Sequence, residues 1–431
     1  MSSTFLSVGI DVGSAFSFMS IVDSSSNLIG KSFKINHDDF ASLERAVSTI
    51  KKAEELESQK AHIFLESTGI YHVPLFCYLS EKGFDVSIIN PLITHSIKNV
   101  GIRKVKNDRL DSIAIAKLGL SPDLRTSKLP VKLVLELRYL VRRYFDLVDE
   151  RAAHVIKLKG FMHVVFPQYL SLFSNITGKT SIMLLEKYGS PQKLLHAHQK
   201  SLIEKIMKAS RKGRNRAAKI YDDLMAAAKA ALTFSCQLNS VYFAIQQSLK
   251  LFKELNTHIT NIVKQIHAVV DANSQEPFIK QIALVDSIPG IGFLSSVALM
   301  CEIGDFSLFH RPKQLFAYFG MEPAVKESGK FKATNVHMSK RGSRIARRVI
   351  FAAALSCIRR TRNGQAVNPY LLEYYQQKAA AKPKMVAIGA VMHKVCNIIF
   401  AVLRDQNPFE LRSPEQHRRL YVPPTRLVLV A

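Results

Sequence analysis

Short apolar runs alternate with longer polar segments over the first third of the chain. Runs rich in β-forming residues, separated by short polar or glycine turns, predict strands at residues 5–11, 16–23, 28–35, 61–67 and 85–90. Between and after them the pattern predicts helices at residues 39–57, at 73–83 and around the segment 105–117. The first three strands follow one another as a meander, whereas the later strands alternate with helices. This order predicts an α/β domain.

The rest of the chain has apolar residues at helical spacing. One predicted helix covers residues 133–167 and ends at Pro167, and a long amphipathic helix with coiled-coil-like spacing covers residues 240–272. Farther on, a tight turn around Pro289 and Gly290 separates two helical stretches within residues 284–309. Such a turn is typical of a helix-hairpin-helix element, whose backbone N–H groups can bind a phosphate. A simple helix-helix corner is the alternative.

These patterns divide the chain into four parts. We expect an α/β domain at residues 1–128, a basic helical and coiled-coil region for oligomerisation at 129–280, a mostly helical C-terminal domain at 281–405, and a tail at 406–431. With 431 residues the chain is too long for one ordinary core, which agrees with several domains.

The charge is strongly positive and unevenly spread. Sixty Lys and Arg against 34 Asp and Glu give a net charge of +26 and a pI near 9.9. The first part carries only +1, whereas residues 129–280 carry +12 and residues 281–431 carry +13. Such an excess suits a polyanion, most simply nucleic acid, because bound cations release condensed counterions. An anionic membrane is the competing partner, but no uncharged apolar run approaches the 18 residues of a spanning helix, and the N-terminus does not resemble a signal peptide.

Two dense groups of basic residues are candidate nucleic-acid contacts. They comprise Arg211, Lys212, Arg214 and Arg216 in the first group, and Lys330, Lys340, Arg341, Arg344, Arg347 and Arg348 in the second. A solvated basic helix face is the alternative for both. The five cysteines are scattered without CxxC spacing, which predicts buried thiols in a reducing cytosol rather than a zinc site or a disulfide framework.

Four acidic residues suggest a metal site. Asp108 and Asp111 are three apart in VKNDRLDSIAIAK, so they share one helical face, although a capping role would also explain them. Asp11 ends the first strand in GIDVGS, and Glu66 lies near the end of the strand AHIFLES. If the strand ends meet at one edge of the sheet, the four carboxylates converge and repel unless cations neutralise them. Oxygen ligands favour Mg²⁺ or Mn²⁺, and two such ions about 4 Å apart promote phosphoryl transfer.

The motifs resemble those of a known family, the DEDD transposases of bacterial insertion sequences, which are also described as bridge-RNA-guided recombinases. The resemblance lies in GIDVG, LEST, KNDRLDSIAIAK, IPGIG, FAYFGM and ESGKFKATNVHMSKRGS, followed by ARR. The resemblance covers the N-terminal and the C-terminal part of the chain, and the motifs follow one another in the same order as in the family. Asn107 stands where the family commonly has Thr, and Ser112 where it commonly has Ala.

The resemblance implies a fold, a site and partners. The N-terminal domain is expected to have a ribonuclease H-like, RuvC-type fold with Asp11, Glu66, Asp108 and Asp111 as ligands of Mg²⁺ or Mn²⁺. The C-terminal domain is expected to supply a nucleophilic serine, which motif position assigns to Ser328, with Ser339 and Ser343 as weaker candidates. The implied partners are donor and target DNA, a bridge RNA of the element and further copies of the chain, as a dimer or a dimer of dimers. The implied location is the cytoplasm of a bacterial or archaeal cell.

Other functions remain open from the sequence. A RuvC-like junction nuclease would use the same acids with water as the nucleophile, and a non-catalytic nucleic-acid-binding protein would explain the charge alone. GIDVGS also resembles a phosphate loop of sugar kinases and actin-like ATPases, but that class needs a second Asp-Gly loop and a glycine-rich adenosine segment, which the sequence lacks.

Overall fold

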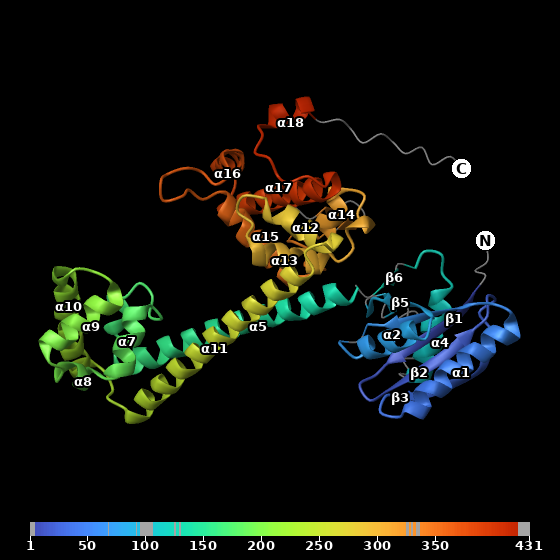
Figure 1. Cartoon of the computed structure of the whole chain (residues 1–431), viewed down its shortest axis with the longest axis horizontal. Helices are drawn as coiled ribbons and strands as arrows, with labels where there is room; N and C mark the ends of the chain where they lie inside the picture. The colour runs from blue at the N-terminus through green and yellow to red at the C-terminus, as the bar shows by residue number, and fades with distance from the viewer. Residues whose placement is uncertain are drawn as a thin grey trace. The chain divides into compact units, whose positions relative to one another are not determined.

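The computed structural model describes residues 5–67, 69–91, 93–94, 107–124, 126–128, 131–324, 327–328, 331–332 and 337–420. The chain divides into two compact units, Met1–Val131 and Lys132–Ala431. Unit 1 is an α/β domain and unit 2 is mostly helical (Figure 1). The expected finer division of the second unit, at residue 280, stays a prediction.

Unit 1 is built on a mixed six-stranded sheet in the order β3-β2-β1-β4-β5-β6. The strands are β1 (Leu6–Val12), β2 (Phe16–Val22), β3 (Leu28–Asn36), β4 (Ala61–Glu66), β5 (Asp85–Ile89) and β6 (Thr126–Ser127). Strands β1, β4 and β5 are parallel, whereas β2 and β3 continue from β1 as the antiparallel meander that the sequence predicts. This mixed sheet, with its strand order, fits a ribonuclease H-like domain.

Helices cover both faces of this sheet. They are α1 (Phe40–Glu57), α2 (His72–Glu81) and α4 (Asp108–Gly119). Alternate residues of the strands, such as Ile10 and Leu65, pack with α1 and α2 in one core. The residues between them face the other way, where Phe64 packs with Ile115 of α4. The period of two along each strand thus separates an α1–α2 face from an α4 face.

Glycines bring α4 unusually close to the sheet. A Cβ at Gly9 of β1 would lie only 2.2 Å from the backbone nitrogen of Ala116, and one at Gly119 would lie 2.4 Å from the Ser7 hydroxyl oxygen. That hydroxyl donates a buried 2.6 Å hydrogen bond to the Ala116 carbonyl. Gly9 lies against Ser112 and Ala116, whereas Ser7, two residues earlier, lies against Ala116 and Gly119, so the helix runs antiparallel to β1. The first turn of α4 therefore lies beside the end of β1.

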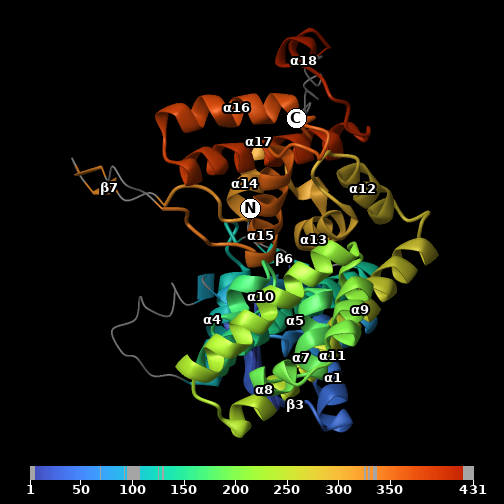
Figure 2. The ribbon, with the colours of Figure 1, turned by 90° about the vertical axis from the view of Figure 1, so that its left-hand side faces the viewer.

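Two long helices organise unit 2. They are α5 (Lys132–Val165) and α11 (Asn239–Ala272), which pack against each other along their length (Figures 1 and 2). The beginning of α5 and the end of α11 share one core, and their other ends share a second, so the helices are antiparallel. The expected coiled-coil packing of residues 240–272 stays a prediction, as does their role in oligomerisation.

The second core lies among the helices between α5 and α11. These helices are α6 (Tyr169–Leu172), α7 (Lys179–Lys187), α8 (Pro191–Leu195), α9 (Gln199–Ser210) and α10 (Arg214–Phe234). Large side chains such as Tyr169 and Phe166 are fully buried there. The hydroxyl of Tyr169 donates to the Ser181 carbonyl at 2.9 Å, so the one polar group of this ring is satisfied.

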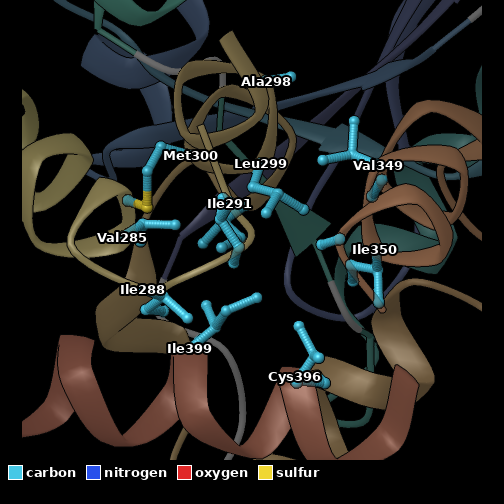
Figure 3. Close-up of a cluster of buried hydrophobic side chains, with 14 of the residues drawn as sticks. Val285, Ile288, Ile291, Ala298, Leu299, Met300, Val349, Ile350, Cys396 and Ile399 are labelled. Atoms are coloured by element: carbon cyan, nitrogen blue, oxygen red, sulfur yellow. The ribbon is translucent and has the colours of Figure 1, made fainter. Parts of the chain in front are cut away.

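The first core is formed mainly by the C-terminal helices. The described elements of the C-terminal region are α12 (Pro277–Asp286), α13 (Phe293–Ile303), a 3₁₀ turn η1 (Phe306–Leu308), α14 (Pro312–Tyr318), the strand pair β7 (Glu327–Ser328) and β8 (Phe331–Lys332), α15 (Arg344–Cys357), α16 (Pro369–Ala381), α17 (Lys384–Asp405) and α18 (Pro414–Leu420). Figure 3 shows Ile288 of the turn after α12, Leu299 of α13 and Ile350 of α15 meeting Ile399 of α17 in a cluster of buried apolar side chains. Such burial is the main stabilising force for a helical domain.

The turn between α12 and α13 packs on α15. Gly290 has a φ of +98°, and a Cβ there would lie 2.7 Å from the Cys357 sulfur. A glycine is needed at this position both for the left-handed backbone and for the close approach. The helix-turn-helix arrangement agrees with the expected segment, but its identification as a helix-hairpin-helix stays a prediction.

The structure bears on the sequence predictions for the cysteines and for membrane-spanning helices. The prediction that all cysteines are buried was wrong for Cys77 and Cys236, which lie on exposed helix or loop positions. The other three thiols are buried, which raises the pKa of Cys301 and of Cys396 to about 12 and keeps them protonated. Among the described helices, α17 alone is long and apolar enough to cross a membrane, but more than half of its apolar stretch packs in the first core.

Candidate functional site

Asp11 occupies the end of β1 on the α4 face of the sheet. Its side chain follows Ser7 and Gly9 in the two-residue alternation of the strand, and both of those residues contact α4. Asp11 is paired with Phe18 on the neighbouring strand β2. The polar residue thus stands where the apolar run of β1 ends and the helix begins.

The start of α4 supplies two further carboxylates. Asn107 is the N-cap residue, and its side-chain oxygen accepts a 3.0 Å hydrogen bond from the Arg109 backbone. This explains how Asn serves at the position where the family commonly has Thr, since both residues cap helices. Asp108 and Asp111 follow in the first turn, where the helix dipole favours negative charge. A role in helix stability and a role as metal ligands are therefore compatible.

A serine pair fixes the same turn to the sheet. The Ser112 hydroxyl lies 2.7 Å from the Ser20 hydroxyl of β2 and donates to the Arg109 carbonyl at 2.8 Å. Ser112 is fully buried, so these partners satisfy its hydroxyl. The residue that departs from the family pattern here thus takes part in the contact that orients Asp108 and Asp111.

Three of the four expected acids come together. Asp11, Asp108 and Asp111 each offer a carboxylate oxygen, and these oxygens all lie within 4.8 Å of one another. Oxygen ligands of one octahedral Mg²⁺, at about 2.1 Å from the ion, lie roughly 3 to 4 Å apart, so small side-chain adjustments would let the three carboxylates share a divalent cation. None of the three is buried, so an ion and its remaining water ligands can reach them. The residues present therefore fit a hard divalent cation.

Glu66 lies next to this group but outside it. The register of β1 and β4 pairs Ile10 with Leu65, so Asp11 and Glu66 are neighbours at the ends of adjacent parallel strands. Glu66 alternates with Phe64 and hence faces α4, as Asp11 does. Its carboxylate is not among the three that approach within 4.8 Å. The structure thus places Glu66 on the expected face and edge, while its role as a ligand stays a prediction.

The three candidate serines occupy different surroundings. Ser328 ends β7, where it pairs with Phe331 of β8, and its side chain lies outside the described residues. The Ser339 hydroxyl donates to the Glu322 carboxylate at 2.8 Å. Ser343 is the N-cap of α15, and its hydroxyl accepts from the Ala346 backbone at 3.1 Å. Ser339 and Ser343 therefore both have structural roles, whereas the choice of nucleophile stays a prediction.

The first basic group lies at an exposed helix-helix junction. Arg211 ends α9 with a φ of +55°, and Arg214 and Arg216 lie in the first turn of α10. All of them, with Lys212, are exposed, and within the described part of the chain their side chains form no ion pair or hydrogen bond. Cations at a helix N-terminus oppose the helix dipole, so this arrangement is unfavourable unless an anion binds there.

The second basic group is partly engaged within unit 2. Arg344 and Arg348 of α15 lie 3.3 and 2.7 Å from the Asp149 carboxylate of α5. Arg347 donates to the backbone carbonyls of Phe319 and Gly342 at 3.0 and 2.8 Å. Lys340 and Arg341 are exposed, and Lys330 lies outside the described residues. Fold stabilisation therefore accounts for three of these cations, and nucleic-acid contact by this group stays a prediction.

Sequence reasoning missed several residues around the acids. Gly9 sets the distance between β1 and α4, and Arg109 lies between the two helical acids with its guanidinium 5.8 Å from the Phe18 ring. The signal for Gly9 was its place in GIDVG, because a glycine inside a buried strand indicates close approach of another backbone. No comparable signal marks Arg109, since its position depends on how α4 lies across β2.

Comparison with known proteins identifies the family. A transposase model of the DEDD type from IS110 matches residues 8–167, and a model described as the transposase IS116/IS110/IS902 family matches residues 282–376. These stretches include the acids and the segment with Ser328, respectively.

Individual relatives agree with these matches. The chain is 23% identical to an uncharacterised protein of insertion element IS110 from Streptomyces coelicolor, over 78% of this chain and 79% of the other. It is 30% identical to the transposase of IS1111A from Coxiella burnetii, over 29% of this chain and 33% of the other. A pilin gene-inverting protein of Moraxella lacunata is 22% identical over 84% of this chain and 86% of its own. The chain belongs to the IS110 family of DEDD transposases, enzymes that act on DNA and depend on divalent metal ions.

Proposed function

We propose that this transposase cuts and rejoins the DNA strands of an insertion sequence, with Mg²⁺ or Mn²⁺ held by Asp11, Asp108 and Asp111 and with Ser328 as the nucleophile. The observation that carries the proposal is the approach of the three carboxylate oxygens to within 4.8 Å of one another. Glu66, at the neighbouring strand end, is proposed as the fourth ligand. A set of oxygen ligands suits these two hard cations better than zinc or copper.

The acids and the fold around them prepare the metal site. A divalent cation bound there would neutralise the repulsion between the carboxylates and supply positive charge to the oxygens of a phosphodiester. Asp108 and Asp111 keep their relative position because they share one helical turn, and Gly9 keeps that turn against β1. The site is thus assembled by backbone packing rather than by flexible side chains, which limits the reorganisation needed for catalysis.

Ser328 is proposed to attack the phosphorus of a DNA phosphodiester. A bond forms between the serine oxygen and phosphorus, and the bond from phosphorus to one deoxyribose oxygen breaks. The hydroxyl proton passes to the departing oxygen, directly or through solvent. Attack by the free DNA hydroxyl of another strand reverses these bond changes and restores the serine. A serine hydroxyl needs activation, so the metal-dependent charge at the acids is required for the step.

The partners follow from charge and from relatives. Net charge of +25 on unit 2 favours nucleic acid, and the exposed cluster from Arg211 to Arg216 is a suitable phosphate contact. A Moraxella relative is named for pilin gene inversion, which supports cutting and rejoining of DNA rather than cutting alone. We further propose that a bridge RNA of the element selects donor and target DNA, that the active form is a dimer or a dimer of dimers, and that it works in the cytoplasm.

Two substitutions test the mechanism in cells that carry a marked copy of the element. Ser328→Ala should abolish recombination and any covalent protein–DNA adduct, and Asp11→Asn should do the same while DNA binding persists. Ser339→Ala is the matched control and should retain recombination. Cleavage that persists in Ser328→Ala would favour a water-dependent nuclease, and full activity of Asp11→Asn would reject the metal site. Sequencing RNA that co-purifies with the full-length protein tests the bridge RNA.

A further inference from the structure

Two aromatic rings and two cations form a strip beside the acids of unit 1. The Lys34 ammonium lies 4.1 Å from the centroid of the Phe16 ring, and the Arg109 guanidinium lies 5.8 Å from that of Phe18. The two rings meet edge to face at 5.9 Å. Lys34, Phe16, Phe18 and Arg109, called the aromatic–basic strip below, thus form a continuous row across β3, β2 and α4.

The strip faces the same way as the candidate metal ligands. Phe18 is the cross-strand partner of Asp11 on β1 and of Lys34 on β3, and cross-strand partners project to one face of a sheet. Ser20, two residues after Phe18, contacts α4, which identifies this face as the α4 face. Arg109 directly follows Asp108 in the chain. The strip therefore begins at the acids and leads away from them toward the β3 edge of the sheet.

Its side chains are placed for contact with a ligand rather than for the core. Lys34 and Arg109 are exposed, and Phe16 and Phe18 are only partly buried. Neither ring belongs to a hydrophobic core within the described residues, although Phe33 of the same sheet packs against one. Aromatic faces that carry cations outside a core are suited to stacking with nucleotide bases, while the cations bind phosphates.

The cations of the strip also reduce the electrostatic repulsion between the acids of unit 1 and a DNA phosphate. Unit 1 carries a net charge of only +1, and its acids crowd at one edge, so a DNA phosphate approaching that edge meets negative charge. Lys34 and Arg109 offset this repulsion next to the acids without occupying the place of a metal ion. An approaching strand would then be attracted along the strip and its phosphate presented to the acids.

We propose that the aromatic–basic strip holds the DNA nucleotides next to the phosphodiester that is cut. The bases stack on Phe18 and Phe16, and the flanking phosphates bind Arg109 and Lys34. These are positioning residues, because they orient the strand while the acids and the serine act on the phosphodiester. The proposal rests on the function proposed above, with DNA rather than RNA as the strand that occupies the strip.

A direct test is photo-cross-linking of the full-length protein. DNA of the element's end carries 5-iodouracil at single positions on either side of the cut, and the cross-linked peptides are mapped with Mn²⁺ present. The expected result is cross-linking to β2 from positions that flank the cut. Cross-links exclusively elsewhere would overturn the proposal. Cross-links to β2 from the element's RNA, and not from its DNA, would also overturn it.

Substitutions provide a second readout. Phe18→Leu should lower the rate of recombination by about 5-fold or more, since loss of one stacked base costs about 1 to 3 kcal/mol. Lys34→Gln should also lower it, because a contact to a flanking phosphate is lost. The binding of Mn²⁺ to the protein, measured by electron paramagnetic resonance, should be unchanged. Lys82→Gln is the matched control, because Lys82 also lies over a ring, that of Tyr78, at 5.4 Å, but directly after α2 at the other face of the sheet.

The results separate this inference from the proposed function. If Asp11→Asn abolishes recombination while Phe18→Leu and Lys34→Gln behave as Lys82→Gln does, the strip is not a positioning surface and the metal-dependent reaction stands. If DNA flanking the cut cross-links to β2 but Asp11→Asn recombines normally, the strip binds DNA and the metal mechanism fails. Loss of Mn²⁺ binding in Phe18→Leu would assign the residue to the fold of the site and overturn a positioning role.

Discussion

The polar contacts that hold α4 in unit 1 differ in kind from those that hold α5 in unit 2. In unit 1, α4 is held on the sheet by small uncharged groups, namely Gly9, Gly119 and the hydroxyls of Ser7 and Ser112. In unit 2, α5 contributes Leu137 and Val141 to the first core, and its long cationic side chains add polar contacts to its neighbours. Arg138 donates to the Cys301 carbonyl at 2.8 Å, and Arg142 binds the nearly buried Glu302 carboxylate at 3.1 Å.

The difference shows how each unit uses its charged residues. In unit 1 uncharged groups make the close contacts between α4 and the sheet, and three carboxylates lie together at the end of β1 and the start of α4. In unit 2 some cationic side chains form ion pairs within the fold, as Arg348 does with Asp149. Its net charge therefore overstates the charge that can contact nucleic acid. The exposed residues Arg211, Arg214 and Arg216 are better candidates than the arginines of α15.

The largest effect is expected from Gly9→Val, which breaks the uncharged interface. Its Cβ would lie 2.2 Å from the Ala116 nitrogen and 2.3 Å from the Ser112 carbonyl oxygen, so α4 has to move. Overpacking of this kind costs about 3 kcal/mol of the free energy of unfolding. Thermal unfolding should show a lower melting temperature for unit 1, and Mn²⁺ binding should be lost with it.

A glycine with free space is the control for this change. Gly160 lies within α5, and a Cβ there would meet no atom within 4 Å. Gly160→Ala should raise stability by about 0.5 to 1 kcal/mol, because alanine loses less backbone entropy in a helix. A Gly9→Val protein as stable as the unsubstituted one would contradict the close packing of α4 on β1.

A smaller effect is expected from Arg142→Ala, which breaks the charged interface. Glu302 is only 6% exposed, so removal of its cationic partner leaves a desolvated carboxylate and costs about 2 kcal/mol of the free energy of unfolding. The neighbouring Arg143→Ala is the control, since its partner Glu150 is 46% exposed, and surface pairs contribute about 0 to 1 kcal/mol. Denaturant unfolding measures both, and equal losses would contradict the distinction.

The smallest effect on stability is expected from the triple variant Arg211→Gln, Arg214→Gln and Arg216→Gln. These side chains have no partner within the described residues, so the melting temperature should stay within experimental error or rise, because cations leave the start of α10. DNA binding should weaken at every sequence, and the slope of log K against log salt should fall by about 0.9 for each lost phosphate contact. An unchanged slope would exclude this cluster as a phosphate contact.

Much of unit 1 could be predicted from the sequence because its signals are local. The apolar runs rich in β-forming residues at β1 and β4, and the turns between β1, β2 and β3, predicted the strands, and the expected meeting of strand ends placed Asp11 near Asp108 and Asp111. Glu66 was expected to converge with them at the same edge of the sheet. The structure places Glu66 on the expected face and edge, at the end of the adjacent strand β4, and its role as a ligand stays a prediction, because a position in a strand does not give the reach of the side chain.

The features that the sequence did not predict depend on distant partners. Asp149 and Arg348 are 199 residues apart in the sequence. No local sequence pattern distinguishes Arg348, which pairs with Asp149, from an arginine that binds a phosphate. The same is true of Lys34 and Arg109, whose neighbours depend on the register of β3 and the placement of α4. The sequence predicted the two long helices as elements. It did not predict their antiparallel pairing, which depends on which of their ends share a core.

The shared ends of α5 and α11 have a consequence for how unit 2 denatures. Leu137 and Ile266 belong to one core, whereas Leu158 and Ile245 belong to the other, so each long helix is anchored at both ends. If either core unfolds, α5 and α11 lose packing contacts at one end. The other core is then destabilised, because it is built on the same two helices. Melting of the two cores is thereby coupled, and we expect a single cooperative transition where two separate globules would give two.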